Sequence, residues 1–331
     1  MDIQKMIRPV PGHGFFAMEG YQVWCPSVVR TADGVFHMLF SRWPLASGHH
    51  AWVTQSEVAY ATASSLMGPY TFSHVVLRGS GHGRWDGDVV HNPTVLEHDG
   101  RYYMYYMGNY GNGEYWDHRN HQRIGAAWAD HPAGPWQRLD QPVLDVSPGA
   151  WDHLMVSNPT VARGPDGRFI MVYKGVSDGP LPAGGAVVCG VAAASHPLGP
   201  FEKIAGPIMV NPEHDRSVED PYIWVQDGRF YAIVKDFQGY FTRTGASSLA
   251  LFESADGIDW KPAESPLALR KEIAWEDGTV EAVAALERPY IWFDGGRPAA
   301  LLCAAAFDEE RERTANIIIP LSREAGGGLE G

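Results

Sequence analysis

The chain repeats one pattern of apolar and polar positions five times. Each repeat opens with an apolar run that begins at a proline, and these prolines lie 67, 66, 62 and 68 residues apart: Pro26, Pro93, Pro159, Pro221 and Pro289. An Asp-Gly pair follows each proline after five to seven residues and leads into a second apolar run, such as "RYYMYYMG" at 101–108. Because Asp-Gly between two β-rich runs is a strong hairpin signal, each repeat is predicted to begin with two antiparallel strands.

A third apolar run follows in every repeat. In the first four repeats a turn rich in glycine and proline then leads into a short fourth run, as in "IGAAWADHPAGPWQRL" at 124–139. The fifth repeat ends after its third run, "NIIIPL" at 316–321. Five units of four short strands predict an all-β fold, a five-bladed β-propeller of four-stranded antiparallel blades. We expect the N-terminal segment before Tyr21 to supply the missing outer strand and close the ring.

Domain organisation follows from the same repeat. The five units run on without a linker, so we predict a single propeller domain over residues 1–321 and a flexible tail at 322–331, where the end of the chain is glycine-rich. A β-sandwich array is the alternative architecture, but it does not need five matched units. No window holds a long apolar stripe of helical period, so we expect almost no helix.

Composition narrows the classes of partner. The chain of 331 residues carries a formal charge of −13, and such a surface repels phosphate backbones and anionic lipid, so we expect no nucleic-acid and no membrane partner. Its three cysteines form no CxxC pair, and we interpret them as free thiols of a reducing compartment. The first residues, "MDIQKMIRPV", hold no apolar signal core, which favours a cytoplasmic location. The oligomeric state stays open.

The residues just before the five prolines differ from blade to blade. In a propeller the first strand of each blade lines the central channel, so these residues are expected to converge at one end of the axis. They are Trp24-Cys25, His91-Asn92, Ser157-Asn158, Glu219-Asp220 and Glu287-Arg288. Varied polar residues on a constant scaffold are typical of a functional site.

The blade motifs resemble those of a known group of enzymes. Runs of the form "x-P-apolar…DG-R-Y-Y" and "A-x-x-x-P-x-G-P-W", together with "HNPTV", "SNPTV" and "EDPYIW", make the chain similar to the five-bladed propeller glycoside hydrolases of families 43, 32 and 117. The resemblance covers roughly Tyr21 to Leu321 and is specific only as a five-fold set. It implies a glycosidase with a carbohydrate substrate.

The resemblance also implies roles for individual residues. In family 43 an Asp before a blade-opening proline is the general base, a second Asp tunes pKa, and a Glu two residues before a proline is the general acid. The matching residues here are Asp220 as base or pKa partner, and Glu219 or Glu287 as acid. The first blade departs from the family pattern, with Cys25 in place of the Asp. A histidine is the acid in enzymes like family 117, which makes His91 a further candidate.

Glycoside cleavage explains why such a cluster is needed. One carboxylic acid protonates the leaving oxygen, and an ionised carboxylate activates water or attacks the sugar. The two need different pKa values, which crowding and nearby cations supply, and Lys235, Arg288 and Arg123 are available as cations. Because side chains alternate along an ideal strand, we expect only one of Glu219 and Asp220 to face the channel.

Two insertions add candidate binding residues at the rim. Two segments are longer than hairpins need: "NGEYWDHRNHQRIG" at 112–125 and "SRWPLASGHHAW" at 41–52. Each is either a functional rim loop or a solvated loop without a role in binding.

Asp86 follows a tryptophan in a "WD" pair that recurs before Pro159, so it either caps a turn or contacts substrate. The predicted substrate-binding residues are Trp43, Asp86, His91, Asn92, His121, Arg123, Asn158, Lys235 and Arg288. We predict no cofactor and no required metal.

The leading functional hypothesis is an exo-acting glycoside hydrolase for a short oligosaccharide or glycoconjugate. Three alternatives remain open on the same scaffold. A glycoside phosphorylase would use the clustered cations to bind phosphate, a lyase would use His91 or a tyrosine, and a non-catalytic propeller would only bind sugar.

Overall fold

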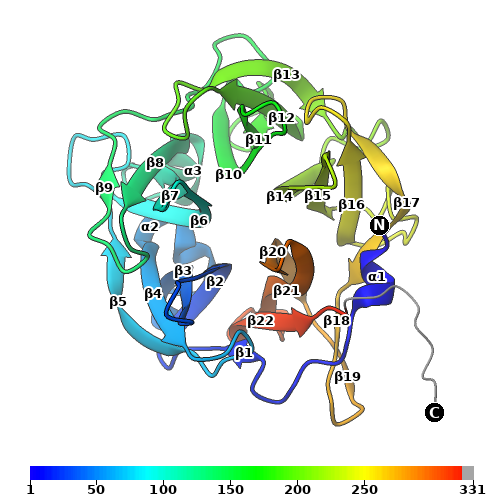
Figure 1. The fold of residues 1–331 in the computed structure, drawn as a ribbon. Coiled ribbons are helices and arrows are strands. Elements are labelled where there is room, and N and C mark those ends of the chain that lie inside the picture. The colour runs from blue at the N-terminus through cyan, green and yellow to red at the C-terminus, as the bar shows by residue number, and fades with distance from the viewer. Residues whose placement is uncertain (323–331) are drawn as a thin grey trace.

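The computed structural model describes residues 1–322 and consists of five four-stranded antiparallel sheets arranged around a central axis (Figure 1). This confirms the predicted five-bladed β-propeller. The predicted flexible tail, 322–331, lies outside the described residues apart from Ser322. Within the described residues, no helix has the length and apolar character needed to cross a membrane.

The first four blades run from the axis to the rim in chain order. The first blade contains β2 (Tyr21–Arg30), β3 (Phe36–Pro44), β4 (Glu57–Ala63) and β5 (Thr71–Leu77). The second contains β6 (Val89–His98), β7 (Arg101–Asn109), β8 (Arg123–Ala129) and β9 (Gln137–Arg138). The third contains β10 (Met155–Arg163), β11 (Phe169–Val176), β12 (Val187–Ala194) and β13 (Glu202–Ile208). The fourth contains β14 (Val218–Gln226), β15 (Arg229–Asp236), β16 (Ser248–Ser254) and β17 (Lys261–Arg270).

The fifth blade joins the two ends of the chain. Its inner strands are β20 (Ala285–Asp294), β21 (Arg297–Ala306) and β22 (Thr314–Pro320). Its outer strand is β1 (Phe15–Phe16), which lies in the segment before Tyr21 and pairs antiparallel with β22. A small hairpin of β18 (Glu272–Ala274) and β19 (Val280–Ala282) precedes the blade.

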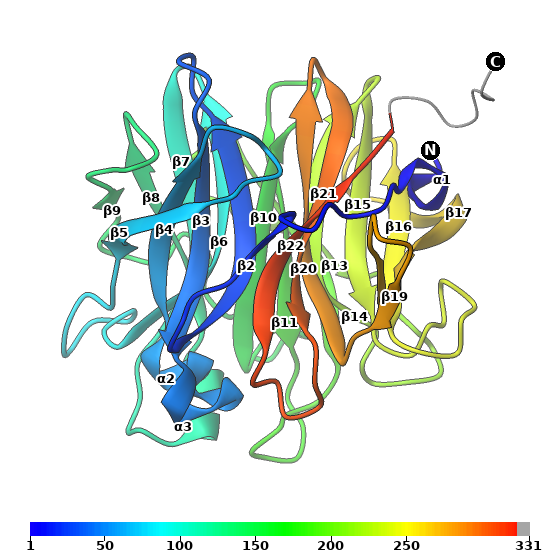
Figure 2. The same ribbon diagram turned by 90° about the horizontal axis from the view of Figure 1, so that it is seen from below.

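Helix is confined to short segments. These are α1 (Ile3–Met6), α2 (Trp52–Gln55), α3 (Tyr115–Asn120) and the 3-10 turns η1 (Leu45–Ser47) and η2 (His49–Ala51). The helices α2 and α3 lie together on one face of the ring (Figure 2). The first insertion contains η1 and η2 and ends where α2 begins, and the second contains α3, so both insertions form short helical turns.

The core lies between neighbouring blades. Phe40 of the first blade packs in one apolar cluster with Leu302 of the fifth, and Leu39 packs in another with Met104 of the second blade. Because each blade is covered on both faces, its middle strands are apolar on both sides, and every residue of β12 is buried. This is why the second and third runs of each repeat are continuously apolar rather than alternating.

The residue directly before each blade-opening proline has a left-handed backbone. The φ angles are 57°, 57°, 52°, 56° and 55° for Cys25, Asn92, Asn158, Asp220 and Arg288. The pairing register shifts at the same place in all five inner strands. A bulge of this kind interrupts the alternation of side chains, so two consecutive residues can face the channel. The expectation that only one of Glu219 and Asp220 faces the channel is therefore wrong, because both line it.

The five left-handed residues form what we call the axial ring. Cys25 Sγ donates to Asn92 Oδ1 at 3.0 Å, and Asn92 Nδ2 donates to Asn158 Oδ1 at 2.8 Å. Asn158 Nδ2 donates to Asp220 Oδ1, which also accepts from Arg288 at 3.1 Å. Arg288 in turn is hydrogen-bonded to the Cys25 side chain. The ring ties all five blades together at the axis through buried polar groups that satisfy one another.

Replacing Asn158 should separate backbone strain from lost hydrogen bonds. Asn158→Ala and Asn158→Gly both remove the acceptor of Asn92 Nδ2 and one of the two donors to Asp220 Oδ1, which costs about 1–3 kcal/mol. Only alanine also strains the left-handed backbone, by about 1–2 kcal/mol, so we expect wild type to be most stable and Asn158→Ala least stable in urea unfolding.

The matched control is Asp227, an exposed left-handed residue at the Asp-Gly turn of the fourth blade. The free energies of unfolding of Asp227→Ala and Asp227→Gly should differ only by the strain of alanine in the left-handed conformation. An Asn158→Ala protein as stable as Asn158→Gly would contradict the role of the left-handed bulge.

Candidate active site

A pocket of about 280 Å³ opens at the end of the axis where α2 and α3 lie. Its floor includes Asn92, Asn158, Asp220 and Arg288 of the axial ring. One wall, from the first blade and α2, is aromatic, and Tyr115 of α3 adjoins it. The cations of the pocket come from α3 and from the third, fourth and fifth blades with their loops.

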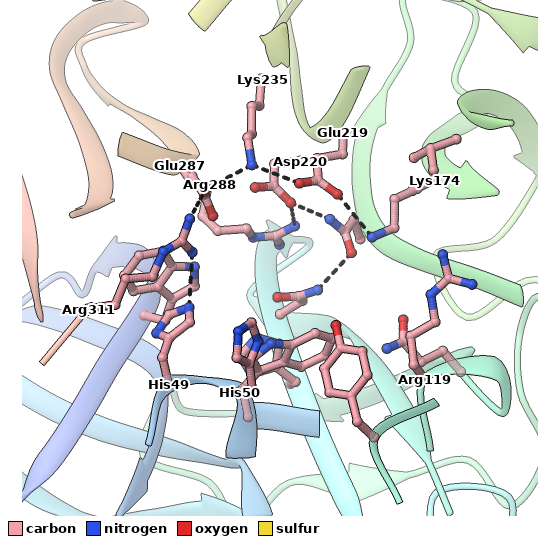
Figure 3. Close-up of a pocket in the computed structure, with 18 of the residues that line it drawn as sticks. His49, His50, Arg119, Lys174, Glu219, Asp220, Lys235, Glu287, Arg288 and Arg311 are labelled. Atoms are coloured by element: carbon pink, nitrogen blue, oxygen red, sulfur yellow. Dashed lines mark hydrogen bonds and ion pairs between the residues drawn. The ribbon is translucent and has the colours of Figure 1, made fainter. Parts of the chain in front are cut away.

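Three carboxylates meet above this floor, and a single lysine bridges two of them (Figure 3). Lys235 Nζ donates to Glu219 Oε1 at 3.0 Å and to Glu287 Oε1 at 2.8 Å. Since both distances share one nitrogen, the two Oε1 atoms lie within 5.8 Å of each other, the sum of the two lengths. The bulges of β14 and β20 bring these glutamates from neighbouring blades to the same depth.

Further cations complete the charge balance of each glutamate. Lys174 Nζ lies 3.2 Å from Glu219 Oε2, and an Arg311 guanidinium nitrogen lies 3.5 Å from Glu287 Oε1. Burial alone would raise the pKa of Glu219, but Lys235 and Lys174 outweigh it and hold that pKa far below its usual range. Burial likewise opposes ionisation of Glu287, yet Lys235 and Arg311 lower its pKa. Both glutamates are therefore anions at neutral pH.

Asp220 has the opposite electrostatic environment. Burial raises the pKa of its carboxyl, Arg288 offsets part of this, and the charges of Glu219 and Glu287 raise it further. Its Oδ1 accepts from Asn158 and Arg288, whereas no residue among 1–322 is hydrogen-bonded to its Oδ2. Asp220 is thus the carboxyl of the three that most readily holds a proton.

The aromatic wall holds two neutral histidines. The His91 ring stacks on Trp52 with centroids 5.0 Å apart, and its Nδ1 is hydrogen-bonded to Ser56 Oγ at 2.7 Å. Burial and then Arg288 lower the pKa of His91 well below its usual value.

His49 lies edge-on to Trp24 and to Trp43, and its Nε2 accepts from Arg311 at 3.1 Å. Burial first and the Arg311 charge second lower the pKa of His49 to about 4. The wall is therefore aromatic and largely uncharged, and such a wall is suited to contact with the apolar face of a sugar ring.

Nine of the twelve site residues predicted from the sequence line this pocket: Trp43, His91, Asn92, Asn158, Glu219, Asp220, Lys235, Glu287 and Arg288. The convergence of the pre-proline positions is the signal that found most of them. Their catalytic and binding roles stay predictions.

Asp86 does not line the pocket, contrary to the prediction of substrate contact. It is buried under the second blade, where its Oδ2 accepts from Tyr106 at 3.0 Å and from Arg138 at 2.8 Å. Asp152 repeats this arrangement with Tyr173, at 3.0 Å. The recurring Trp-Asp pair is therefore a structural element of the repeat, with the acid fully engaged by its own blade.

His121 and Arg123 are also outside the pocket. The His121 ring stacks on Tyr110 with centroids 4.4 Å apart, and Arg123 pairs with Asp145 at 2.5 Å. Helix α3 causes the difference, because it presents Tyr115 and Arg119 to the pocket in their place.

Several pocket residues escaped the sequence prediction. They come from α3, from the start of β12 and from loops between strands: Tyr115, Trp116, Arg119, Gln122, Val187, Arg216, Phe237 and Arg311. A usable signal existed only in the second insertion, where positions 115 and 119 share one face if the segment is helical. Within residues 1–322, no group of three or more His, Cys, Asp or Glu side chains is arranged to hold a metal ion.

Comparisons with known proteins support the fold. No protein-family model matches the chain, and no curated protein sequence matches it. Among solved structures, a glycoside hydrolase 17% identical in sequence matches 99% of this chain and 95% of its own, with a TM-score of 0.71. A family 117 glycoside hydrolase from the marine bacterium Zobellia galactanivorans is 18% identical over 98% of this chain and 94% of its own, with a TM-score of 0.64.

An α-L-arabinofuranosidase from Lactobacillus brevis is similar as well. It is 14% identical over 97% of this chain and 94% of its own, with a TM-score of 0.61. These matches agree with the resemblance noted in the blade motifs, and they establish that the chain shares the propeller fold of these enzymes.

The buried neutral His49 makes a testable contribution to stability. Its pKa is about 4 in the folded chain against 6.5 ordinarily, so between these values the unfolded chain binds a proton that the folded chain does not. Stability is therefore lost as pH falls from 6.5 to 4, by up to about 3 kcal/mol for this one group.

The His49→Gln variant should lose less stability over that pH range in urea unfolding. His50→Gln, the same change at the exposed neighbouring residue, is the control. Equal pH slopes for wild type and His49→Gln would show that His49 is not buried as a neutral ring.

Proposed function

We propose that this protein is a glycoside hydrolase whose working groups are Asp220, Glu219 and Glu287. The observation that carries the proposal is the split within one carboxyl cluster. Two members are held ionised by cations, while the third is biased toward the protonated form. Glycoside hydrolysis needs an acid and a base with separated pKa values in one pocket. The shared fold with solved glycoside hydrolases supports the same reaction class.

In the proposed mechanism Asp220 is the general acid. Its Oδ1 is fixed by Asn158 and Arg288, so the proton resides on Oδ2. As the bond between the anomeric carbon and the leaving oxygen breaks, that proton passes to the leaving oxygen. This differs from the assignment implied by the family resemblance, in which Asp220 was the base or its pKa partner and Glu219 or Glu287 the acid.

Glu287 is the proposed partner of Asp220. It takes a proton from a water molecule while the water oxygen bonds to the anomeric carbon, which completes the hydrolysis. Glu287 is better suited to this role than Glu219, because both of its ion pairs use Oε1, whereas a lysine engages each oxygen of Glu219, at 3.0 and 3.2 Å. We assign Glu219 to holding Lys174 and Lys235 in place.

The pocket geometry favours an exo-acting enzyme on a short oligosaccharide or glycoconjugate. The axial ring closes the floor, and α2 and α3 pack against each other beside the opening. A pocket closed at one end accepts the end of a glycan, and the partly exposed Trp52 of the aromatic wall is available to stack on the sugar ring.

Asp220→Asn should abolish turnover. Asparagine still offers a carbonyl oxygen to Asn158 and Arg288, so the axial ring survives while the proton donor is lost. We expect a loss of about 100- to 10,000-fold in kcat/KM on the best substrate from a panel of aryl glycosides, with unfolding little changed. Asp227→Asn, at the exposed turn of the same blade, is the control. Full turnover by Asp220→Asn would refute the assignment.

Lys235→Met should shift the pH dependence of activity. The mechanism needs ionised Glu287, so activity falls as pH drops through the pKa of Glu287, which Lys235 lowers below 4.5. Without the lysine charge that pKa rises, and the acidic limb of kcat/KM moves to higher pH. Lys261→Met removes an exposed lysine paired with Glu253 and should leave the limb in place. An unmoved limb in Lys235→Met would exclude Glu287 as the base.

A further inference from the structure

We propose that the substrate carries a carboxylate, as a uronic acid does, and that Arg119 and Arg216 form the subsite that binds it. The inference deepens the proposed function by naming its substrate class, and it rests on that function. Its starting point is an excess of positive charge in the pocket of a chain whose formal net charge is −13.

The excess is visible in the residues that line the pocket. Six side chains there are permanently or normally cationic: Arg119, Lys174, Arg216, Lys235, Arg288 and Arg311. Only three are carboxylates: Glu219, Asp220 and Glu287. An acidic protein that concentrates cations in its one axial pocket creates a local field that attracts anions.

The ion pairs show which cations remain available. Glu219, Asp220 and Glu287 together engage four of them, Lys174, Lys235, Arg288 and Arg311. Within residues 1–322, Arg119 and Arg216 have no carboxylate partner in an ion pair. The surplus charge is therefore localised on these two arginines.

The two arginines have other contacts that hold them in place. Arg119 donates to Asn120 Oδ1 at 2.9 Å and to the Ala183 carbonyl at 3.0 Å, both from the same guanidinium nitrogen. The Arg216 guanidinium lies over the Phe237 ring at 5.9 Å. Neither set of contacts neutralises charge, so each guanidinium keeps donors for an anion.

The two charges also repel each other. Burial is the largest influence on the half-buried Arg119 and lowers its pKa; the charges of Tyr115 and Glu219 raise it, and the charge of Arg216 lowers it. A buried guanidinium without a directly paired carboxylate is costly, and a bound anion relieves that cost. Arginine is suited to this because its planar donors match a carboxylate in two parallel hydrogen bonds.

Position distinguishes a substrate carboxylate from a free phosphate nucleophile. A nucleophile must lie beside the anomeric carbon, next to the catalytic carboxylates, where the cations are already paired. Arg119 stands instead on α3, across the pocket from His49 of the aromatic wall (Figure 3), and Arg216 precedes β14. A sugar stacked on that wall would direct a peripheral acidic group toward the two arginines.

The test compares acidic and neutral sugars of matched configuration. Glucuronides and galacturonides are assayed beside the corresponding glucosides and galactosides, with mannuronate and iduronate derivatives completing the panel. We expect at least one acidic substrate to exceed its neutral counterpart by about 10- to 100-fold in kcat/KM, with a preference that weakens as salt is added. The variants Arg119→Met and Arg216→Met should each remove most of the preference while leaving turnover of the neutral sugar within a few-fold.

Arg229→Met, which removes an exposed arginine paired with Glu253, is the matched control. Neutral sugars processed as well as every acidic one would overturn the inference. So would turnover that depends on inorganic phosphate and yields a sugar phosphate, because the arginines would then serve a phosphorylase. Calorimetric binding of the acidic sugars to wild type, lost in both arginine variants, would support the subsite even if no glycoside were hydrolysed. In that case only the proposed function would fail.

Discussion

The left-handed backbone before each blade-opening proline is the constraint on which the site depends. It places a bulge at the same depth in five strands, and each bulge turns a pair of neighbouring side chains toward the axis. One residue of each pair joins the axial ring, and in every blade but the third the other residue lines the pocket; Ser157 of the third blade is buried and donates to Asn158 instead. The repeat thus supplies both a closed floor and a set of positions where chemistry can vary without disturbing the blades. Asparagine and aspartate tolerate this conformation best and occupy three of the five positions.

The same geometry sorts three crowded carboxyls into different states. Glu219 and Glu287 sit where lysines and Arg311 reach them, so they ionise in spite of burial. Asp220 sits one residue further along its strand, within the ring, where a single guanidinium is outweighed by burial and by two neighbouring anions. A one-residue offset along β14 therefore separates an ionised carboxylate, Glu219, from a carboxyl biased toward its protonated form, Asp220. Such separation is what acid–base catalysis on a glycosidic bond requires.

The blades and the floor of the pocket could be predicted from the sequence because the positions that form them recur in every repeat. Five prolines, five Asp-Gly turns and five sets of apolar runs predict the blades, and the convergence of the pre-proline residues predicts the floor of the pocket. The wrong or missing site predictions concern residues outside the repeat, or residues whose recurrence within the repeat was given a functional meaning. The recurrence of Asp86 as Asp152 was itself the sign of a structural role, since its partners Tyr106 and Tyr173 recur too. Arg216 could not be found, because the loop before β14 has no counterpart in other blades, and Arg119 could be found only by treating the second insertion as a helix.

The protonation states of the three carboxyls are the central claim. The most direct test is a carbon-13 NMR titration of the side-chain carboxyls, with resonances assigned through Asp220→Asn, Glu219→Gln and Glu287→Gln. The account predicts that the Asp220 carboxyl titrates above the ordinary value of 3.8, while both glutamates titrate below 4.5. A glutamate that keeps its proton at neutral pH beside an ionised Asp220 would contradict it.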